Sequence, residues 1–125
     1  MSYSTSSWIF LFIALGLNAF ANILLKIGSI QAKTLSQNAS FWEKGLNFLN
    51  IATCAGILLF ALNVLVYRKA LANIPISIAY PIMLSVGLVI VILAARFIPI
   101  MNEKITLTQI MGIILIGIGV WMLAK

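Results

Sequence analysis

Three polar residues interrupt an apolar stretch near the start of the chain, and they are its first candidates for binding chemistry. Asn18, Asn22 and Lys26 stand four residues apart within ALGLNAFANILLK, residues 14–26. On a helix this spacing stacks the three side chains on one face, one turn above another. Two interpretations fit such a stripe. The amides and the ammonium group either line a cavity for a polar head group, or the amides hydrogen-bond to a packed neighbouring helix.

The composition indicates that the elements carrying this stripe lie in a membrane. Hydrophobic residues make up 63% of the chain and charged residues 8%, and the mean hydropathy is +1.16. A soluble domain carries about 25% charged residues, so this chain lacks the charge to solvate a globular surface. Lipid cannot satisfy free backbone N–H and C=O groups, and continuous apolar runs therefore predict helices.

Four apolar runs approach the roughly 20 residues that cross a bilayer. They predict spans at about residues 8–26, 48–67, 76–97 and 105–123, within one domain over residues 1–125. The expected fold class is an all-α membrane protein with four transmembrane helices. In the long connection after the first run, Phe41 and Trp42 are expected to dip into the membrane interface.

The side chains needed for most catalysis are missing from the sequence. It has no histidine, one cysteine and two acidic residues, Glu43 and Glu103, both in predicted connections. No metal-ligand cluster, nucleophile–base pair or glycine-rich phosphate loop occurs. We therefore expect no enzymatic activity, no metal and no cofactor. The net charge of +6 fits basic loops beside a membrane better than a nucleic-acid partner.

Two segments in the second half of the chain carry recognisable motifs. They are NIPISIAYPIMLSVGLVIV, residues 73–91, and GIILIGIGV, residues 112–120. The first resembles the Ile-Pro…Ile-Ala-Tyr segment of the small multidrug resistance family, and the second resembles that family's dimerisation motif. Lys26 follows Asn18 by eight residues, as a lysine follows the membrane carboxylate in the family. Tyr80–Pro81 is more similar to the wider drug/metabolite transporter superfamily, in particular to the small flippase subunits for aminoarabinose-linked undecaprenyl phosphate.

The resemblance implies a small-multidrug-resistance-like fold and a transport role in a bacterial inner membrane. It does not imply proton coupling, because two positions depart from the family pattern. Asn18 stands where the cation/proton antiporters have a glutamate, and an amide does not titrate. Met83 stands where the family has a tryptophan that lines the drug pocket.

The expected substrate site combines polar, cationic and apolar side chains from the first three spans. Its candidates are Asn18, Asn22, Lys26, Asn63, Tyr80, Met83 and Arg96. Structural alternatives remain open for most of them. Asn63 also fits an interfacial position, Tyr80 fits between packed helices, and Lys26 and Arg96 fit cations that extend to the interface.

The last two spans carry residues that favour bending and close packing. Pro81, Ser85 and Gly87 predict a bend in the third helix, which is either part of alternating access or a static kink. Gly112, Gly117 and Gly119 predict a dimer contact between fourth helices, because small residues let helices approach closely in lipid. Glycine is also simply frequent in membrane helices.

Together these observations predict a dimer, of two copies or of two paralogues, embedded in the lipid bilayer. The expected substrate is an amphiphile of the lipid-linked sugar type, with a polar head group that is either neutral or anionic. One alternative is a multidrug or small-metabolite exporter. The other, of a different class, is a non-transporting subunit that stabilises a larger membrane assembly.

Overall fold

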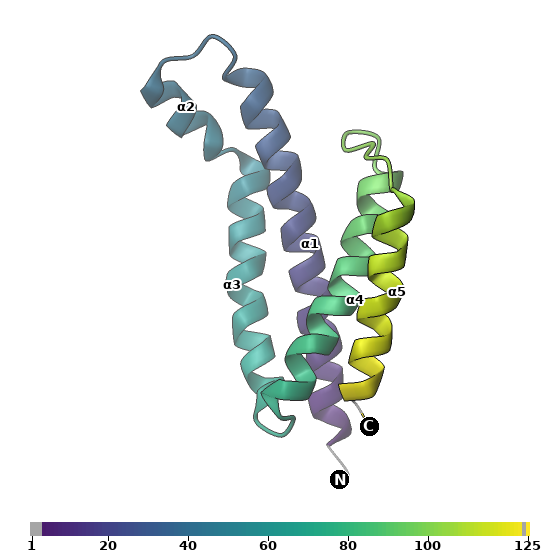
Figure 1. Cartoon of the computed structure of the whole chain (residues 1–125). Helices are drawn as coiled ribbons and strands as arrows, with labels where there is room; N and C mark the ends of the chain where they lie inside the picture. Colours follow the sequence, from purple (N-terminus) through teal and green to yellow (C-terminus); the bar gives the residue numbers. More distant parts are fainter. Residues whose placement is uncertain (1–3, 124) are drawn as a thin grey trace.

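Five helices make up the regular structure of the computed structural model, which describes residues 4–123 and 125 (Figure 1). They are α1 (Thr5–Leu35), α2 (Phe41–Phe48), α3 (Ile51–Leu71), α4 (Ile76–Phe97) and α5 (Leu107–Leu123). Three of them, α1, α3 and α4, are long and apolar enough to cross a membrane. Helix α5 is apolar but shorter; its 17 residues reach about 26 Å at the usual rise per residue. The predicted all-α membrane fold is confirmed.

The first half of the chain has more helix than the apolar runs alone predict. Helix α1 continues from the expected end at Lys26 to Leu35. Its 31 residues extend about 46 Å, beyond the ~30 Å hydrocarbon core. Helix α3 begins at Ile51 rather than at residue 48, whereas α4 has the predicted bounds 76–97.

The predicted connection after the first run contains the short helix α2. Ser40 and Glu43 form a capping box: the Ser40 N–H donates to Glu43 Oε2 at 2.8 Å, and the Glu43 N–H donates to Ser40 Oγ at 3.5 Å. These bonds, chiefly the backbone one, lower the pKa of the Glu43 carboxyl. None of the residues of α2 is buried, and the Phe41 and Trp42 rings meet edge to face at 5.9 Å. This exposed aromatic pair suits an interfacial position.

The contact between α1 and the antiparallel α3 is built from small side chains at seven-residue spacing (Figure 1). The buried residues with this spacing are Ser7, Ala14, Ala21 and Gly28 on α1 and Gly56, Asn63 and Ala70 on α3. A seven-residue repeat returns to nearly the same helical face after two turns. Small side chains at these positions allow the two backbones to approach closely, which is a major source of attraction between helices in lipid.

Two glycines mark the closest approach of the pair. A Cβ added at Gly28 would overlap Thr53 Oγ1 and would lie 2.8 Å from the Thr53 backbone nitrogen. A Cβ added at Gly56 would lie 2.9 Å from Leu25 Cγ and 3.1 Å from the Ala21 carbonyl oxygen. A Cβ 2.8 Å from a backbone nitrogen essentially never occurs, so Gly28 is required for this geometry, whereas a side chain at Gly56 would force Leu25 and the Ala21 carbonyl to shift.

Asparagine side chains hold the α1–α3 pair at both ends. At one end, Asn50 Nδ2 donates to the Gly28 carbonyl oxygen at 2.7 Å, while Asn50 Oδ1 caps α3 by accepting from the Thr53 N–H at 2.9 Å. At the other end, Asn73 Nδ2 donates to Ser7 Oγ at 2.9 Å. The two bonds between α1 and the α3 region fix the register of the helices.

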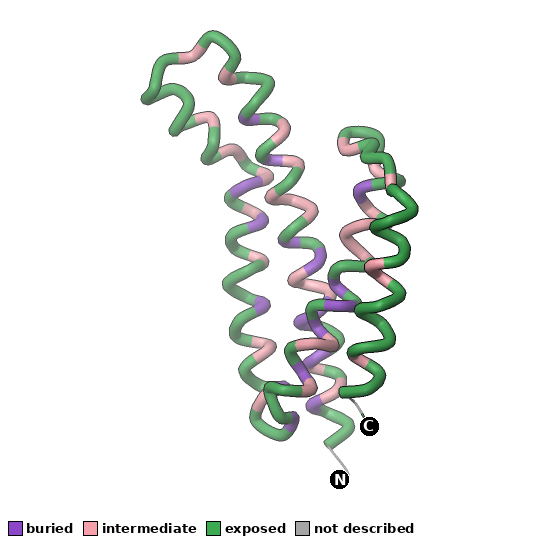
Figure 2. Tube along the Cα trace, in the orientation of Figure 1, coloured by how far each residue is buried: buried purple, intermediate pink, exposed green. Residues whose placement is uncertain are grey.

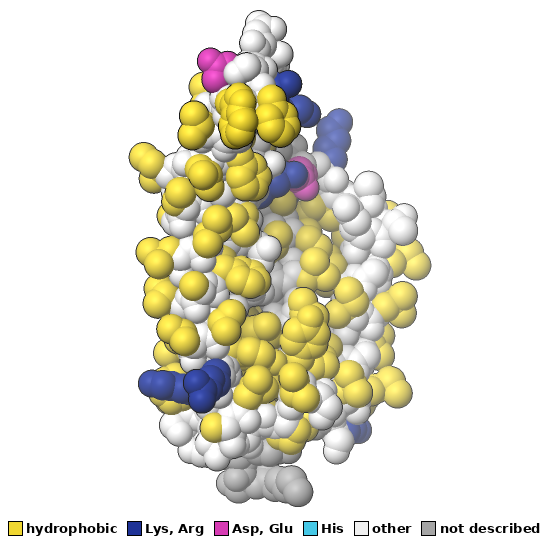
Figure 3. Space-filling model, turned by 90° about the vertical axis from the view of Figure 1, so that its left-hand side faces the viewer, with side chains coloured by type: hydrophobic (Ala, Val, Ile, Leu, Met, Phe, Trp, Pro, Cys, Tyr) yellow, Lys and Arg dark blue, Asp and Glu magenta, His cyan; other side chains and the backbone are white. Residues whose placement is uncertain are grey.

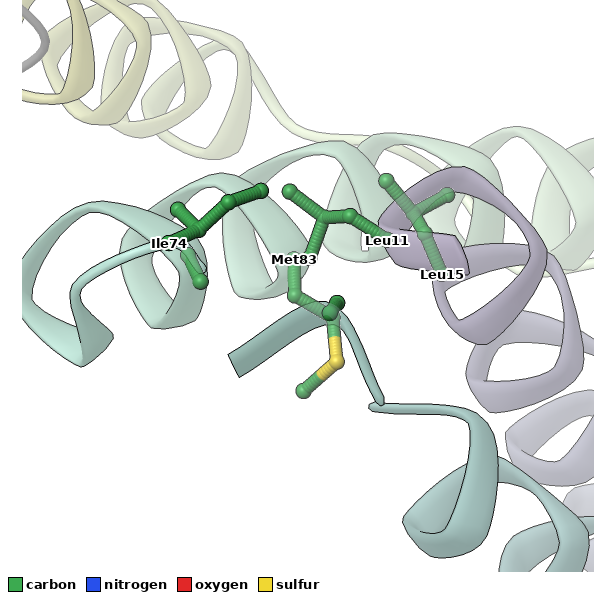
Figure 4. Close-up of a cluster of buried hydrophobic side chains, with 6 residues drawn as sticks. Leu11, Leu15, Ile74 and Met83 are labelled. Carbon is green, nitrogen blue, oxygen red and sulfur yellow. The ribbon is translucent and has the colours of Figure 1, made fainter. Parts of the chain in front are cut away.

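Helix α4 packs on α1 near the chain termini, and α5 packs on α4. Figure 4 shows Leu11 and Leu15 of α1 beside Met83 of α4 and Ile74 of the α3–α4 connection. Helix α5 has no buried residue, and Figure 2 shows it largely exposed while the buried positions gather on α1, α3 and α4. Apolar side chains cover the middle of the face in Figure 3, whereas the basic ones lie toward its two ends. The described part of the chain thus presents an apolar band that lipid can solvate.

Three polar side chains of α3 have a buried oxygen without a hydrogen-bond partner among the described residues: Thr53 Oγ1, Asn63 Oδ1 and Tyr67 Oη. Asn63 is 3% exposed, and Tyr67 lies one turn further along α3. An unpaired buried polar group costs roughly 1–3 kcal/mol.

Replacing Gly28 by alanine should destabilise the bundle, because the new methyl group meets Thr53 at the tightest point of the α1–α3 contact. We expect a loss of about 1–3 kcal/mol, typical of overpacking, measured by unfolding in a detergent titration. Gly16→Ala is the matched control, since nothing lies within 4 Å of a Cβ at Gly16. If both variants unfold at the same point as the parent, the close approach is not as tight as described.

Asn63→Leu should raise stability in the same assay by roughly 1–3 kcal/mol, because it removes the unpaired amide from a buried position. Asn50→Leu, at the N-cap of the same helix, is the contrasting variant. It loses the hydrogen bonds to the Gly28 carbonyl and from the Thr53 N–H and should unfold more easily. A destabilised Asn63→Leu protein would mean that the Asn63 amide is satisfied, for example by a bound water.

Candidate functional site

The polar stripe of α1 lies as the sequence predicts, with its two amides in contact. Asn22 Nδ2 donates to the Asn18 carbonyl oxygen at 2.8 Å and lies 3.5 Å from Asn18 Oδ1. The second contact is at the limit of a hydrogen bond. Because Asn22 already satisfies part of its donor capacity within α1, the outward-facing amide atoms of both residues are available to a further group.

The stripe faces α4 across a recess of about 200 Å³ lined by Asn18, Asn22, Leu84, Gly87, Leu88 and Val91. Gly87 opens this space, since a Cβ there would lie 3.5 Å from Asn18 Nδ2. The recess thus combines two amides on one wall with an apolar opposite wall. Such a lining can hydrogen-bond a hydroxylated or amino-substituted group on one side and contact its apolar part on the other.

Lys26, at the end of the stripe, is paired with an acidic residue. Its Nζ lies 2.8 Å from Glu103 Oε1, and both side chains are about half exposed (50% and 49%). The sequence predicts that the first helix ends at Lys26, but α1 continues to Leu35. Lys26 therefore lies within α1, and its side chain projects toward the α4–α5 connection. The ammonium remains within reach of solvent or of a ligand.

Tyr80 lines a second hollow, next to the first. This groove of about 480 Å³ lies between α4 and α5 and is lined by Tyr80, Pro81, Leu84, Ser85, Leu88, Ile116 and Val120. Leu84 and Leu88 line both spaces, so the polar recess and the apolar groove adjoin each other on α4. Tyr80 is 49% exposed and is not tucked between helices.

The structure separates three predicted site residues from the polar recess. Met83 is buried against Leu11 and Leu15 in the core cluster. Asn63 is buried in the α1–α3 contact. Arg96 is exposed in the last turn of α4 and forms no ion pair within the described residues. Their assignment to a substrate site remains a prediction.

The residues predicted to bend α4 and to join two chains have contrasting surroundings. Pro81 lies inside α4, and Ser85 Oγ donates to the Ile82 carbonyl oxygen at 3.2 Å, one turn away. Such a bond accompanies bent helices in membranes. The predicted dimer glycines lie on α5, and nothing is within 4 Å of a Cβ added at Gly112, Gly117 or Gly119. These three positions are therefore uncovered by the rest of this chain, and the dimer contact remains a prediction.

A further polar hollow, of about 460 Å³, lies at the α1–α2 connection and is lined by Thr34, Leu35, Gln37, Asn38, Ala39, Glu43 and Asn47. Its one charged lining residue is an acid, which disfavours an anion. Among the described residues no cluster of three His, Cys, Asp or Glu side chains could hold a metal ion. The recess on α1 is thus the better candidate for a polar ligand.

Sequence reasoning missed residues that act through tertiary contacts. Glu103 was noted only as a loop carboxylate, although it pairs with Lys26. Asn50, Asn73, Gly28 and Gly56 received no role, yet they set the α1–α3 contact. The capping pattern Ser40-x-x-Glu43 was visible in the sequence and could have predicted α2.

Comparison with known proteins gives relatives over most of the chain. An uncharacterised protein of Sinorhizobium fredii is 32% identical over 118 residues, which cover 94% of each chain. A probable 4-amino-4-deoxy-L-arabinose-phosphoundecaprenol flippase subunit ArnF of Serratia proteamaculans is 34% identical over 109 residues, or 82% of this chain and 80% of the relative. The corresponding ArnE subunit of Erwinia tasmaniensis is 31% identical over 104 residues, or 83% and 94%.

No family model and no solved structure matches the sequence. The relatives nevertheless agree with the resemblance seen in the third and fourth spans, and they align with nearly the whole bundle described above. The chain is a multi-pass integral membrane protein that belongs to the family of the small 4-amino-4-deoxy-L-arabinose-phosphoundecaprenol flippase subunits.

Proposed function

We propose that this chain is a flippase subunit that moves a lipid-linked sugar phosphate across the bacterial inner membrane. The observation that carries the proposal is the α1 stripe, in which Asn18 and Asn22 line a recess against α4 and Lys26 follows one turn further. The amides suit the hydroxyl and amino groups of a sugar, and the ammonium suits the phosphate. The names of the relatives support this substrate class.

The placement of acidic residues supports transport without a membrane carboxylate. The chain has two acidic side chains; Glu43 lies in α2 and Glu103 in the α4–α5 connection. Neither is inside a spanning helix. Asn18, at the position of the antiporter glutamate, carries no charge at any physiological pH. Competition between a proton and a cation at one buried carboxylate is therefore not available in the helices.

A second subunit completes the proposed site. The recess of about 200 Å³ is smaller than the roughly 300–1,000 Å³ of ordinary ligand pockets. Helix α5 contacts α4 and leaves its glycines open. We infer that α5 packs against its counterpart in a second copy or in a paralogue, and that the polar recesses of the two chains face a shared cavity. The polyprenyl tail remains in contact with lipid and with the apolar groove beside Tyr80.

Asn18→Leu should abolish transport and leave the helical bundle intact, because leucine is well solvated in an apolar interior but cannot hydrogen-bond a sugar. The measurement is translocation of the sugar-phosphate lipid in proteoliposomes that contain the chain with its partner subunit. Phe20→Leu, on an exposed part of the same helix, is the control and should transport normally. If Asn18→Leu transports like the parent and unfolds more easily, the amide serves helix packing only.

The double variant Gly112→Leu/Gly119→Leu should shift the protein from dimer to monomer in mild detergent. Bulky side chains on α5 keep a second helix at a distance and remove close packing. Circular dichroism should show unchanged helicity, and Gly45→Leu on α2, where the space is also open, should leave the dimer intact. An unchanged oligomer would refute the α5 interface.

A further inference from the structure

One ion pair connects the middle of the first helix to the last connection of the chain. Lys26 Nζ on α1 and Glu103 Oε1 in the α4–α5 connection are 2.8 Å apart. Elsewhere in the described residues no lysine or arginine reaches a carboxylate. Because both side chains are about half exposed, the pair contributes little to stability, roughly 0.2–1 kcal/mol by the usual measure of exposed pairs.

The backbone of the α4–α5 connection directs Glu103 back toward the bundle. The Glu103 N–H donates to the Ala95 carbonyl oxygen at 3.0 Å, and the Asn102 N–H donates to that of Ile98 at 3.0 Å. Asn102 has a φ of 39°, a left-handed conformation that asparagine tolerates better than most residues. The carboxylate is thus held beside the last turn of α4 and not free in a disordered loop.

This arrangement places the ion pair at the end of the polar recess. On the α1 wall, Lys26 is one turn beyond Asn22; on the α4 wall, Ala95 is one turn beyond Val91, and Glu103 is bonded to Ala95. Both walls therefore lead from the recess to the same pair. Lys26 is the cation one turn beyond the amides on the α1 wall of the recess, and it already has an anionic partner.

Resting on the proposed function, we propose that Glu103 competes with the phosphate of the substrate for Lys26 and so tunes affinity and specificity. A carboxylate and a phosphate oxygen are equivalent acceptors for an ammonium group. A phosphodiester carries one negative charge, so it replaces Glu103 without a change in the net charge around Lys26. A neutral lipid cannot make this exchange. Binding of the substrate then releases the α4–α5 connection from α1.

A double-mutant cycle on Lys26 and Glu103 tests the competition directly. The probe is the methyl ester of undecaprenyl phosphate, a phosphodiester with one negative charge, titrated into the intact subunit assembly in nanodiscs, with the uncharged alcohol undecaprenol as reference. Glu103→Gln should bind the phosphate about 1.4- to fivefold more tightly, which is the free energy of the broken ion pair converted to a ratio of dissociation constants. Lys26→Gln should bind it more weakly, and Lys26→Gln/Glu103→Gln should match Lys26→Gln, because without the cation there is nothing to compete for.

Glu43→Gln is the matched control, since it makes the same change in net charge on α2, where Glu43 bonds to Ser40. It should bind like the parent. The affinity of all variants for undecaprenol should be unchanged, a result that a purely structural role of Glu103 would not give.

The outcomes separate this inference from the proposed function. A parent that prefers the phosphate, combined with unchanged or weaker binding by Glu103→Gln, overturns the competition and makes Glu103 a residue that positions Lys26. Tighter binding by Glu103→Gln that persists in the double variant also overturns it. A parent that binds both lipids equally, or neither, refutes the anionic substrate itself and with it the competition.

Discussion

The close approach of α1 and α3 is the constraint on which the rest of the bundle depends. Gly28 and Gly56 remove the two side chains that would hold the backbones apart, and Asn50 and Asn73 fix the register from opposite ends. In lipid there is no hydrophobic effect to draw two apolar helices together, so tight packing and hydrogen bonds between helices must provide the attraction. Both are concentrated in this pair.

The α1–α3 contact also decides where the polar stripe points. Since the face with Ala14, Ala21 and Gly28 is used for α3, Asn18 and Asn22 lie on the neighbouring face, which helical geometry turns toward α4. Their position against Gly87 follows from this. The stripe is therefore oriented by packing residues that have no polar chemistry of their own. Helix α5 packs mainly on α4. It therefore does not set the orientation of the stripe on α1.

The long apolar runs and the stripe could be predicted from the sequence because each depends on local composition and spacing. The bounds of α4 follow from Pro75, which precedes the helix, and from the apolar run after it. The extension of α1 beyond Lys26 does not follow from apolarity, because polar residues interrupt that segment, although alanine, lysine and leucine within it favour helix. Tertiary features had no such local pattern. Met83 packs in the core, and Glu103 meets Lys26, only because α4 crosses α1.

Asn18 stands where the resembling cation/proton antiporters have a membrane carboxylate, so proton binding at this position cannot change the charge of the helix. A carboxylate in a spanning helix changes charge when it binds a proton, whereas an amide offers the same hydrogen bonds at every pH. In the proposed competition, Lys26 on α1 exchanges its anionic partner, and that partner, Glu103, lies outside the helices. An exposed pair of this kind is weak, so exchanging its anionic partner costs little free energy. Because Glu103 belongs to the connection that leads into α5, the proposed exchange would release α5 and its connection from α1.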